Sequence, residues 1–374
     1  MRFLPAIEGI VPYTPGTPIE NVMRQYGLTE VVKLASNEFP LPPLAEVKAA
    51  VIDAFDEVNR YPDGDCLDLR QALAELFGRR LEEVAVGNGM DDLLELLGDA
   101  LLDHGDEVVF ADPSFMLYED VCMRRDARAV MIPLLPDFGH DLDAMAAAVT
   151  PRTKLIIVCN PNNPTGNYIP AAEIAAFVDK VPEDVLVVID EAYNEFVSAD
   201  DREDTLKLQA ERHNVCLFRT FSKAYGLAGL RVAYGLCPEV VRGALDKVRQ
   251  PFNVNRLAQV AALEALRHQD QILERRRMVI EMREYLENAL ARMGRAVVPS
   301  QTNFVLVSIE GLSVPQDEVC EALMAMGVIV RDGNGLGCPG WARVSTGTRY
   351  EMDFFLDRLR SLEPDASTGQ DGGT

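Results

Sequence analysis

Asp190 and Lys223 are the residues of this chain whose types and positions most directly suggest chemistry. Each stands at or just beyond the end of a short apolar run, where a buried strand would reach the edge of a sheet. Two further polar clusters follow similar runs, GNGMDD at 87–92 and PNNPTG at 161–166. In open parallel sheets, ligands bind outside the carboxyl ends of the strands. We therefore expect the four clusters to meet at one edge of a sheet.

Asp190 ends the run VLVVID, so its carboxylate should be partly buried and needs a cationic or hydrogen-bonding partner. Such a carboxylate could keep a heterocyclic nitrogen protonated. A protonated pyridine ring withdraws electrons from a carbanion, which is the central requirement of pyridoxal phosphate (PLP) chemistry. Tyr193 could donate a hydrogen bond to the phenolic oxygen of that ring. The residues alone also allow a structural aspartate and a packing tyrosine.

Lys223 follows the apolar run VCLFRTF and one serine. Burial disfavours a charged ammonium, so the pKa of this lysine should fall toward that of a reactive amine able to form a Schiff base. The segment SKAYGLAGLR adds Ser222, glycine amides and Arg231 as donors for a phosphate. It is not a Walker loop, because the glycine spacing before the Lys-Ser/Thr pair is absent. A solvated surface lysine is the alternative interpretation.

The other two clusters predict an anion site and a rigid turn. GNGMDD is a strand–glycine–helix junction, where amides at the helix start bind anions and Gly87 and Gly89 permit close backbone approach. PNNPTG holds two prolines and two asparagines, and its turn could aim Asn163 at a ligand. Ordinary loops would account for either segment if it stood alone.

The sequence from 35 to 257 alternates short apolar runs with helical patterns. Six runs are rich in aliphatic residues: EEVAV, EVVFAD, KLIIVCN, VLVVID, VCLFRTF and RVAYGLC. Such strands flanked by helices indicate an α/β fold with a mostly parallel sheet buried on both faces. We assign this segment to a large domain and residues 258–363 to a smaller α+β domain. Residues 1–34, whose opening is proline-rich, should form an extended arm joining the small domain, and residues 364–374 a disordered tail.

Composition and charge exclude several classes of partner. The 374 residues carry a formal charge of −23, and such a surface repels nucleic acid and anionic membranes, which demand clustered Lys and Arg. The seven cysteines and four histidines are too scattered to predict a metal site. No apolar run reaches the roughly 18 residues of a membrane helix, and no signal-peptide pattern opens the chain. We expect a soluble, cytoplasmic enzyme with reduced thiols.

Six motifs occur in order along the chain: VVKLASNEFP, RYPDG, DPSFMLY, PNNPTG, DEAY and TFSKAYGLAGLR. Together they resemble the fold-type-I, class-II-like PLP-dependent aminotransferases, and within them the histidinol-phosphate aminotransferase family. The resemblance extends from PYTPG at 12–16 to RVSTGT at 343–348. It implies PLP as the cofactor and a homodimer with shared active sites.

The resemblance also implies which residues hold the cofactor. Lys223 would bind it covalently and then move the proton between the substrate Cα and C4′ of the cofactor. Asp190 would pair with the ring nitrogen, while Tyr193 and Asn163 would hold the phenolic oxygen. The cofactor phosphate would be bound by Ser222, Arg231 and the amides of Gly89, Met90 and Asp91.

Two aromatic residues complete the cofactor site implied by the resemblance. Phe115, in DPSFMLY, would stack on the face of the ring. Tyr61, in RYPDG, would reach across to the phosphate bound by the neighbouring subunit. This shared contact is the reason for expecting a homodimer.

The substrate contacts implied by the resemblance are Tyr13, Asn37, Arg331 and Arg343. Arg343 would clamp a carboxylate such as that of glutamate, because a guanidinium pairs with it bidentately. Arg331 and Tyr13 would lie near the distal phosphate of histidinol phosphate.

The chain departs from the family pattern at three positions near these contacts. Met90 stands where a small residue is usual in the phosphate loop, and Asp92 replaces a more common glutamate. Trp341 stands in the stretch before Arg343, where the family has other residues. The Trp341 departure bears on which amino donor and acceptor are used.

The hypothesis that follows is reversible transamination of L-histidinol phosphate with 2-oxoglutarate, giving imidazole acetol phosphate and L-glutamate, a step of histidine biosynthesis. An aromatic amino-acid aminotransferase is the first alternative and would need an apolar substrate pocket. A phospho-amino-acid decarboxylase on the same scaffold is the second. A PLP-fold binding or regulatory protein without turnover is the third, and the set of Lys223, Asp190 and Arg343 argues against it.

Overall fold

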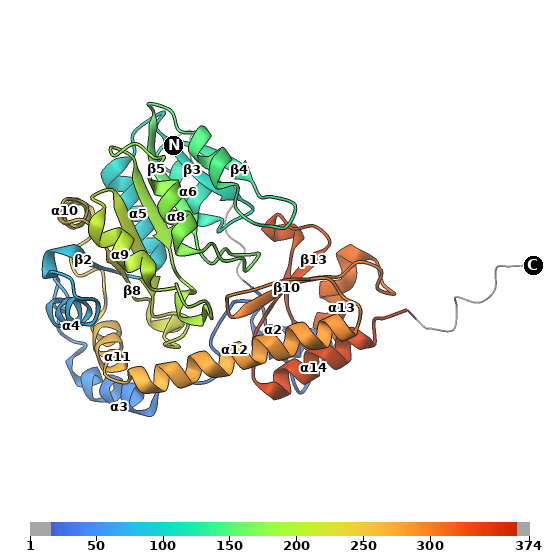
Figure 1. The fold of residues 1–374 in the computed structure, drawn as a ribbon. Coiled ribbons are helices and arrows are strands. Elements are labelled where there is room, and N and C mark those ends of the chain that lie inside the picture. The colour runs from blue at the N-terminus through green and yellow to red at the C-terminus, as the bar shows by residue number, and fades with distance from the viewer. Residues whose placement is uncertain (1–15, 365–374) are drawn as a thin grey trace, which may run out of the picture.

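The structure, a computed structural model, describes residues 16–364. Its largest element is a seven-stranded sheet in the order β2-β8-β7-β6-β5-β3-β4 (Figure 1). The strands are β2 (Val84–Gly87), β3 (Glu107–Asp112), β4 (Arg128–Pro133), β5 (Thr153–Cys159), β6 (Leu186–Asp190), β7 (Val215–Thr220) and β8 (Ala233–Leu236). All pairs are parallel except those of β8, which runs antiparallel to β2 and β7. The predicted α/β class with a mostly parallel central sheet is confirmed.

The central strands are apolar on both faces because both faces are covered by helices. Ile189 packs on one side, with α4 (Leu67–Phe77), α7 (Leu142–Ala147), α8 (Ala171–Val178) and α11 (Arg256–Leu266). Val188 packs on the other, with α5 (Met90–Leu101), α6 (Leu117–Met123) and α10 (Glu239–Val248). Successive side chains of a strand point to opposite faces, so each strand feeds two hydrophobic clusters.

Strand β4 was not among the six strands expected from the sequence. It lies at the edge of the sheet, and its residues alternate between exposed and half-buried positions. An edge strand of this kind lacks the continuous apolar run by which the central strands were recognised. The segment RAVMIP therefore gave a weaker signal than its neighbours.

A second, smaller unit follows in the sequence. The long helix α12 (Gln269–Arg292) runs from beside α11 to a four-stranded sheet (Figure 1). That sheet has the order β12-β13-β10-β9 with antiparallel pairing. Its strands are β9 (Val297–Val298), β10 (Phe304–Ser308), β12 (Arg331–Asp332) and β13 (Trp341–Ser345), accompanied by α13 (Val319–Ala325) and α14 (Arg349–Arg360). The domain boundary at 257 stays a prediction.

The N-terminal segment attaches to this smaller unit. Strand β1 (Val32–Lys33) pairs in parallel with β11 (Val328–Ile329). The helix α2 (Ile19–Tyr26) precedes it, so part of the expected arm is more regular than its prolines suggested. Helix α3 (Ala45–Ala54) then leads into the large unit and packs against α11. The tail expected from residue 364 onward lies outside the described residues, apart from its first residue.

Two features of composition can be followed in the described residues. All seven cysteines are free, and six of them are buried. Between residues 16 and 364, no helix combines the length and apolar character that a membrane crossing requires.

Candidate active site

The four polar clusters named from the sequence line one pocket at the carboxyl edge of the large sheet. Its volume is 260 Å³, and its walls carry residues from the ends of β5, β6 and β7 and from the start of α5. The residues of the four clusters in its walls are Met90, Asp91, Asn163, Asp190, Ala192, Tyr193, Ser222, Lys223, Ala228 and Arg231. A second pocket of 580 Å³ shares Lys223 and Asn163 with it and adds Arg331 and Arg343. The two pockets therefore form one site with two compartments.

Asp190 is the last residue of β6, and its side chain is buried. Its Oδ2 accepts a hydrogen bond from the Tyr118 hydroxyl at 2.7 Å, and its Oδ1 accepts one from the Ala192 amide at 3.0 Å. Burial raises the pKa of Asp190 to about 6, while these two hydrogen bonds oppose the rise. The carboxylate is therefore ionised at neutral pH and ready to pair with a cationic ring nitrogen.

Tyr118 is a site residue that the sequence reasoning missed. It lies on α6, is fully buried, and holds its ring edge-on to Phe115, with 5.7 Å between the ring centroids. The only sequence signal was its place at the end of the DPSFMLY motif. A tyrosine at the start of an amphipathic helix otherwise resembles any other core aromatic residue.

Lys223 stands three residues beyond the end of β7 and lines both compartments. Burial lowers the pKa of its ammonium to about 8, helped by the nearby Arg343 and Arg231 guanidinium groups. Its Nζ lies 3.5 Å from the Ser36 carbonyl oxygen and 5.6 Å from the centre of the Tyr193 ring. A reactive neutral amine is thus accessible close to neutral pH, as expected from its position after an apolar run.

The start of α5 and the Arg231 guanidinium form an anion-binding corner. Gly89 caps the helix with φ = 90°, and a Cβ at this position would collide with the Arg231 guanidinium. Arg231 donates from Nη1 to Ser222 Oγ at 3.4 Å and from Nη2 to Asp91 Oδ2 at 3.4 Å. Helix amides, a hydroxyl and a guanidinium converge here, which is the donor set that a phosphate requires.

The departures at Met90 and Asp92 leave this corner intact. Met90 is buried, and its side chain packs in the hydrophobic cluster of the sheet face that α5 covers. Asp92 Oδ2 accepts hydrogen bonds from the Asn88 amide and from Asn253 Nδ2, both at 2.7 Å. Its carboxylate is thereby turned to the helix start and to Asn253, where it stabilises the turn.

Tyr193 and Asn163 both have their acceptor atoms occupied. The Tyr193 oxygen accepts a hydrogen bond from Asn37 Nδ2 at 3.0 Å. Asn163 Oδ1 accepts one from Arg343 Nη1 at 2.5 Å. The phenolic proton of Tyr193 and the amide protons of Asn163 remain to be donated into the pocket. Asn37, expected to contact substrate, also lines the larger compartment, but its side-chain amide is engaged with Tyr193.

Two arginines stand side by side in the larger compartment. Arg343 on β13 is directly opposite Arg331 on β12 in the antiparallel register. Arg343 is buried, and its Nη2 also donates to the Ala35 carbonyl oxygen at 2.9 Å. Within residues 16–364, no hydrogen bond or ion pair engages the Arg331 side chain. This compartment therefore offers two guanidinium groups beside Lys223.

Within residues 16–364, which the structure describes, Trp341 lines neither compartment. Its ring packs edge-on against Phe138, with 5.2 Å between the ring centroids. It belongs to a small hydrophobic cluster with Val298, Leu306 and Cys338. The departure from the family pattern at this position is therefore a matter of packing.

The remaining aromatic residues lie in different surroundings. Phe115 lines both compartments, where its ring can face a planar ligand. Tyr61 is 81% exposed and stacks on Phe252, with 4.7 Å between the ring centroids. It lines neither compartment of the described chain. Tyr13 lies outside the described residues.

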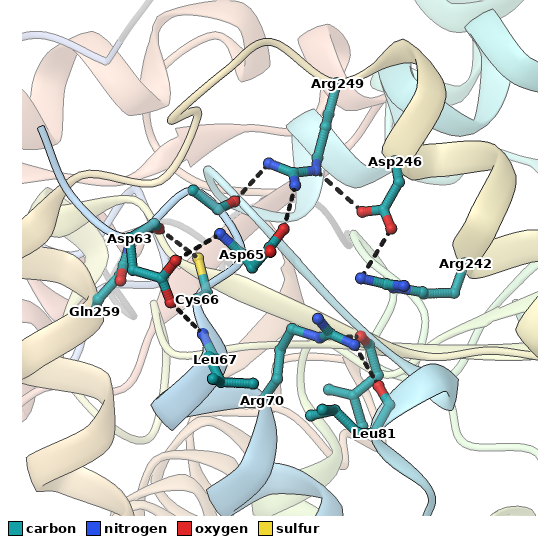
Figure 2. Close-up of polar contacts among 12 residues, drawn as sticks. Asp63, Asp65, Cys66, Leu67, Arg70, Leu81, Arg242, Asp246, Arg249 and Gln259 are labelled. Carbon is teal, nitrogen blue, oxygen red and sulfur yellow. Dashed lines mark hydrogen bonds and ion pairs between the residues drawn. The ribbon is translucent and has the colours of Figure 1, made fainter.

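The segment just after Tyr61 makes several contacts through charged side chains (Figure 2). Asp63 Oδ2 accepts from the Leu67 amide at 2.7 Å at the start of α4. Arg249, just after α10, donates to Asp65 Oδ1 at 2.9 Å and to Asp246 Oδ1 at 3.0 Å. These contacts tie the segment that follows Tyr61 to the start of α4 and to the end of α10.

Comparison with known proteins places this site in a family context. Residues 29–359 match the family model for aminotransferase class I and II. The chain is 45% identical to the histidinol-phosphate aminotransferase of Moorella thermoacetica, covering 96% of this chain and 92% of that protein. It is 46% identical to histidinol-phosphate aminotransferase 2 of Ralstonia nicotianae, covering 95% of each.

Solved structures show the same fold. The histidinol-phosphate aminotransferase of Sinorhizobium meliloti, crystallised with pyridoxal 5′-phosphate, superposes with a TM-score of 0.87 and 31% identity. The match covers 96% of this chain and 98% of that one. An aspartate aminotransferase of Thermus thermophilus with maleate superposes with a TM-score of 0.83 and 25% identity, over 97% of this chain and all of that one.

Proposed function

Because the chain belongs to the aminotransferase class I and II family, we propose that it is a PLP-dependent transaminase acting on L-histidinol phosphate. The reaction transfers the amino group to 2-oxoglutarate and gives imidazole acetol phosphate and L-glutamate. One observation carries the proposal: the Lys223 amine stands in a single site between the Asp190 carboxylate and the paired guanidinium groups of Arg331 and Arg343. The relatives named for this activity match almost the full chain.

The residues of the smaller compartment fit PLP. Asp190 would pair with the ring nitrogen, Tyr193 and Asn163 would donate to the phenolic oxygen, and the corner of Gly89 and Arg231 would hold the phosphate. The φ of 90° at residue 89 favours glycine, and a side chain there would also displace the Arg231 guanidinium that lies against it. When bound, PLP supplies a protonated ring that withdraws electrons from the substrate Cα.

Two residues of this chain have separate proposed roles in proton transfer, Lys223 at the substrate Cα and Asp190 at the ring nitrogen. Lys223 Nζ would hold the cofactor and, as a free amine, would carry the proton from the substrate Cα. Its depressed pKa keeps a useful fraction of the amine neutral at physiological pH. Asp190 would keep the proton on the ring nitrogen, and the Tyr118 hydroxyl orients that carboxylate by donating to its Oδ2.

The larger compartment accounts for the two substrates. Arg343 suits the carboxylate of glutamate, and Arg331 suits the distal phosphate of histidinol phosphate, because guanidinium groups bind both anions bidentately. The remaining walls carry both charged residues (Asp112, Glu119, Asp120 and Arg124) and apolar ones (Phe110, Met116, Leu117, Met131 and Leu336). The two arginines, and not the walls as a whole, therefore favour a phosphorylated substrate over the aromatic amino acid of the alternative.

Absorbance spectroscopy of the purified protein tests the proposal. PLP should produce a yellow band, and glutamate and histidinol phosphate should each convert it to the pyridoxamine form, with phenylalanine reacting much more slowly. Faster conversion by phenylalanine would assign the protein to the aromatic class. Release of CO2 from a phosphorylated amino acid without any need for 2-oxoglutarate would indicate the decarboxylase. A protein that forms no band with PLP would contradict the cofactor assignment.

We further infer a homodimer in which Tyr61 completes the site of the partner. The support is that Tyr61 is largely exposed, stacks on Phe252 and lies away from the compartments of its own chain. Mixing inactive Lys223→Ala subunits with weakly active Tyr61→Ala subunits should restore activity, since each hybrid dimer holds one site with both native residues. Mixtures that stay at the average of the two parents would contradict a shared site. The cytoplasmic location stays a prediction.

A further inference from the structure

A chain of hydrogen bonds connects the strand of Arg343 to the hydroxyl of Tyr193. Ser345, two residues after Arg343 on β13, donates from Oγ to Asn37 Oδ1 at 3.0 Å. Asn37 Nδ2 in turn donates to the Tyr193 oxygen at 3.0 Å. All three side chains are buried, with 3%, 2% and 4% exposure for Ser345, Asn37 and Tyr193. Ser345 also lines a neighbouring cavity of 410 Å³. Burial strengthens each hydrogen bond of the chain relative to one fully exposed to water.

The backbone leaves Asn37 little freedom except rotation of its amide. Its φ is +53°, a left-handed conformation in which asparagine is one of the few tolerated residues. Its amide N–H donates to Ser345 Oγ at 2.8 Å, and its carbonyl oxygen accepts from Asn303 Nδ2 at 3.0 Å. The side-chain amide can still present either its oxygen or its nitrogen to Tyr193.

The hydroxyl of Ser345 selects between these two orientations. Its oxygen already accepts from the Asn37 backbone, so its proton needs an acceptor, and Asn37 Oδ1 lies at hydrogen-bond distance. That contact turns Nδ2 toward Tyr193, whose oxygen must then accept. The reverse orientation would place Oδ1 against Tyr193 and draw the phenolic proton away from the pocket.

We propose that Ser345 is a positioning residue that sets the direction of the Tyr193 phenolic proton and thereby tunes the bound cofactor without touching it. Ser345 lines neither compartment of the site in the part of the chain that the structure describes. The inference rests on the proposed function, since it concerns the donor aimed at the phenolic oxygen of PLP. A hydrogen bond donated to that oxygen stabilises its negative charge and lowers the pH at which the cofactor absorbance changes.

The test is a pH titration of the absorbance of the PLP-loaded protein. Ser345→Ala frees the Asn37 amide to rotate, so Tyr193 donates part of the time to Asn37, and the midpoint should rise by about 0.5 pH unit. Tyr193→Phe removes the donor altogether and should raise the midpoint by about 1 unit. Because Ser345 acts through Tyr193, the double variant should titrate like Tyr193→Phe alone.

Two controls separate positioning from a general structural effect. Ser345→Thr keeps a hydroxyl at the same place and should restore the native midpoint. Ser308→Ala removes a hydroxyl from β10 of the same sheet, where it accepts only from the Glu310 amide at 3.4 Å, and should leave the midpoint unchanged. Thermal unfolding of each variant verifies that the fold is retained.

The possible outcomes are distinct. An unchanged midpoint in a well-folded Ser345→Ala protein would overturn the inference, as would a shift that adds in full to that of Tyr193→Phe. A midpoint that rises in Ser345→Ala, with no additional rise when the same substitution is made in the Tyr193→Phe protein, would support it. Failure of the wild-type protein to form any PLP absorbance would instead overturn the proposed function on which the inference rests.

Discussion

The two sheets contribute to the site in different ways. In the large sheet, Asp190 is the last residue of β6 and Lys223 lies beyond the end of β7. In the small sheet, Arg343 and Ser345 lie within β13. The large sheet is buried on both faces, so its polar chemistry is confined to the strand ends. The small sheet buries only one face fully in its own core, which leaves alternate positions free for function.

The alternation along β13 shows how this works. Ala342 and Val344 are buried in the core formed with α12 and α14, and Arg343 and Ser345 point to the opposite face. A period of two thus separates the residues that hold the strand in place from those that serve the site. The comparison teaches that each buried parallel strand presents a functional residue only at its end. An antiparallel strand can present several, at every second position along its length. The comparison also predicts separate effects: substitutions at the strand ends of the large sheet should alter the cofactor for every substrate, whereas substitutions of Arg331 and Arg343 in the small sheet should alter the binding of particular substrates. Ser345 differs from these two arginines because it acts on the cofactor through Tyr193.

The largest effect should come from the large sheet. Lys223→Ala removes both the covalent anchor and the proton carrier, so turnover with every substrate should fall by at least about 10⁴-fold. Steady-state rates with glutamate and with histidinol phosphate would measure this. Lys207→Ala, on the exposed side of α9 (Asp204–Glu211), is the matched control and should retain full activity. Appreciable turnover by Lys223→Ala would break the assignment of chemistry to this strand end.

The small sheet should show its strongest effect at Arg343. Arg343→Lys keeps the charge but loses bidentate pairing and the contact with Asn163, so KM for glutamate should rise roughly 10- to 100-fold. The yellow cofactor band should still form, because the covalent anchor is intact. Failure of the variant to bind PLP would show that the two sheets are not separable in the way proposed.

A more selective effect is expected at Arg331. Arg331→Gln should raise KM for histidinol phosphate about tenfold while leaving KM for glutamate nearly unchanged, because only one of the two substrates carries a phosphate. Arg331→Lys should recover part of the loss, since a single charge remains. Equal losses for both substrates would move Arg331 from a phosphate contact to a general role in the compartment.

The smallest effect should be a change in pH dependence at Tyr118. The pKa of Asp190 is about 6 in the cofactor-free protein, and the hydrogen bond from Tyr118 holds it below the value that burial alone would give. As pH falls through this pKa, Asp190 is protonated and the affinity for PLP declines. Tyr118→Phe should raise the pKa, so affinity should be lost at a pH about 0.5 to 1 unit higher.

This loss of affinity is measured by the binding of PLP to the cofactor-free protein at a series of pH values. A second decline toward low pH comes from Lys223, whose amine is progressively protonated below about 8, and it should be unaffected by the substitution. A uniform loss of affinity at all pH values would indicate that Tyr118 contributes only packing.

Much of the large sheet could be predicted from the sequence because its signal is local. A continuous apolar run ending in a polar residue identifies a central parallel strand and its functional end together, as for Asp190. The edge strand β4 was missed because its burial is partial and its apolar pattern is weak. The helix α2 is amphipathic, but it has only 8 residues and begins directly after Pro18, at the end of the proline-rich opening that favoured an extended arm. Tyr118 was missed because nothing in its neighbourhood shows that it faces the carboxylate.

The sequence by itself determined the α/β class and the polar clusters at the strand ends, with Lys223 and Asp190 among them. These follow from hydrophobic periodicity and from the residues that interrupt it, which act over a few positions along the chain. The tertiary structure alone decided that Tyr118 supports Asp190, that Asn37 supports Tyr193 and that Ser345 orients Asn37. These contacts join residues 72, 156 and 308 positions apart in the chain. Hydrogen-bond direction over such separations depends on packing, and no local pattern encodes it.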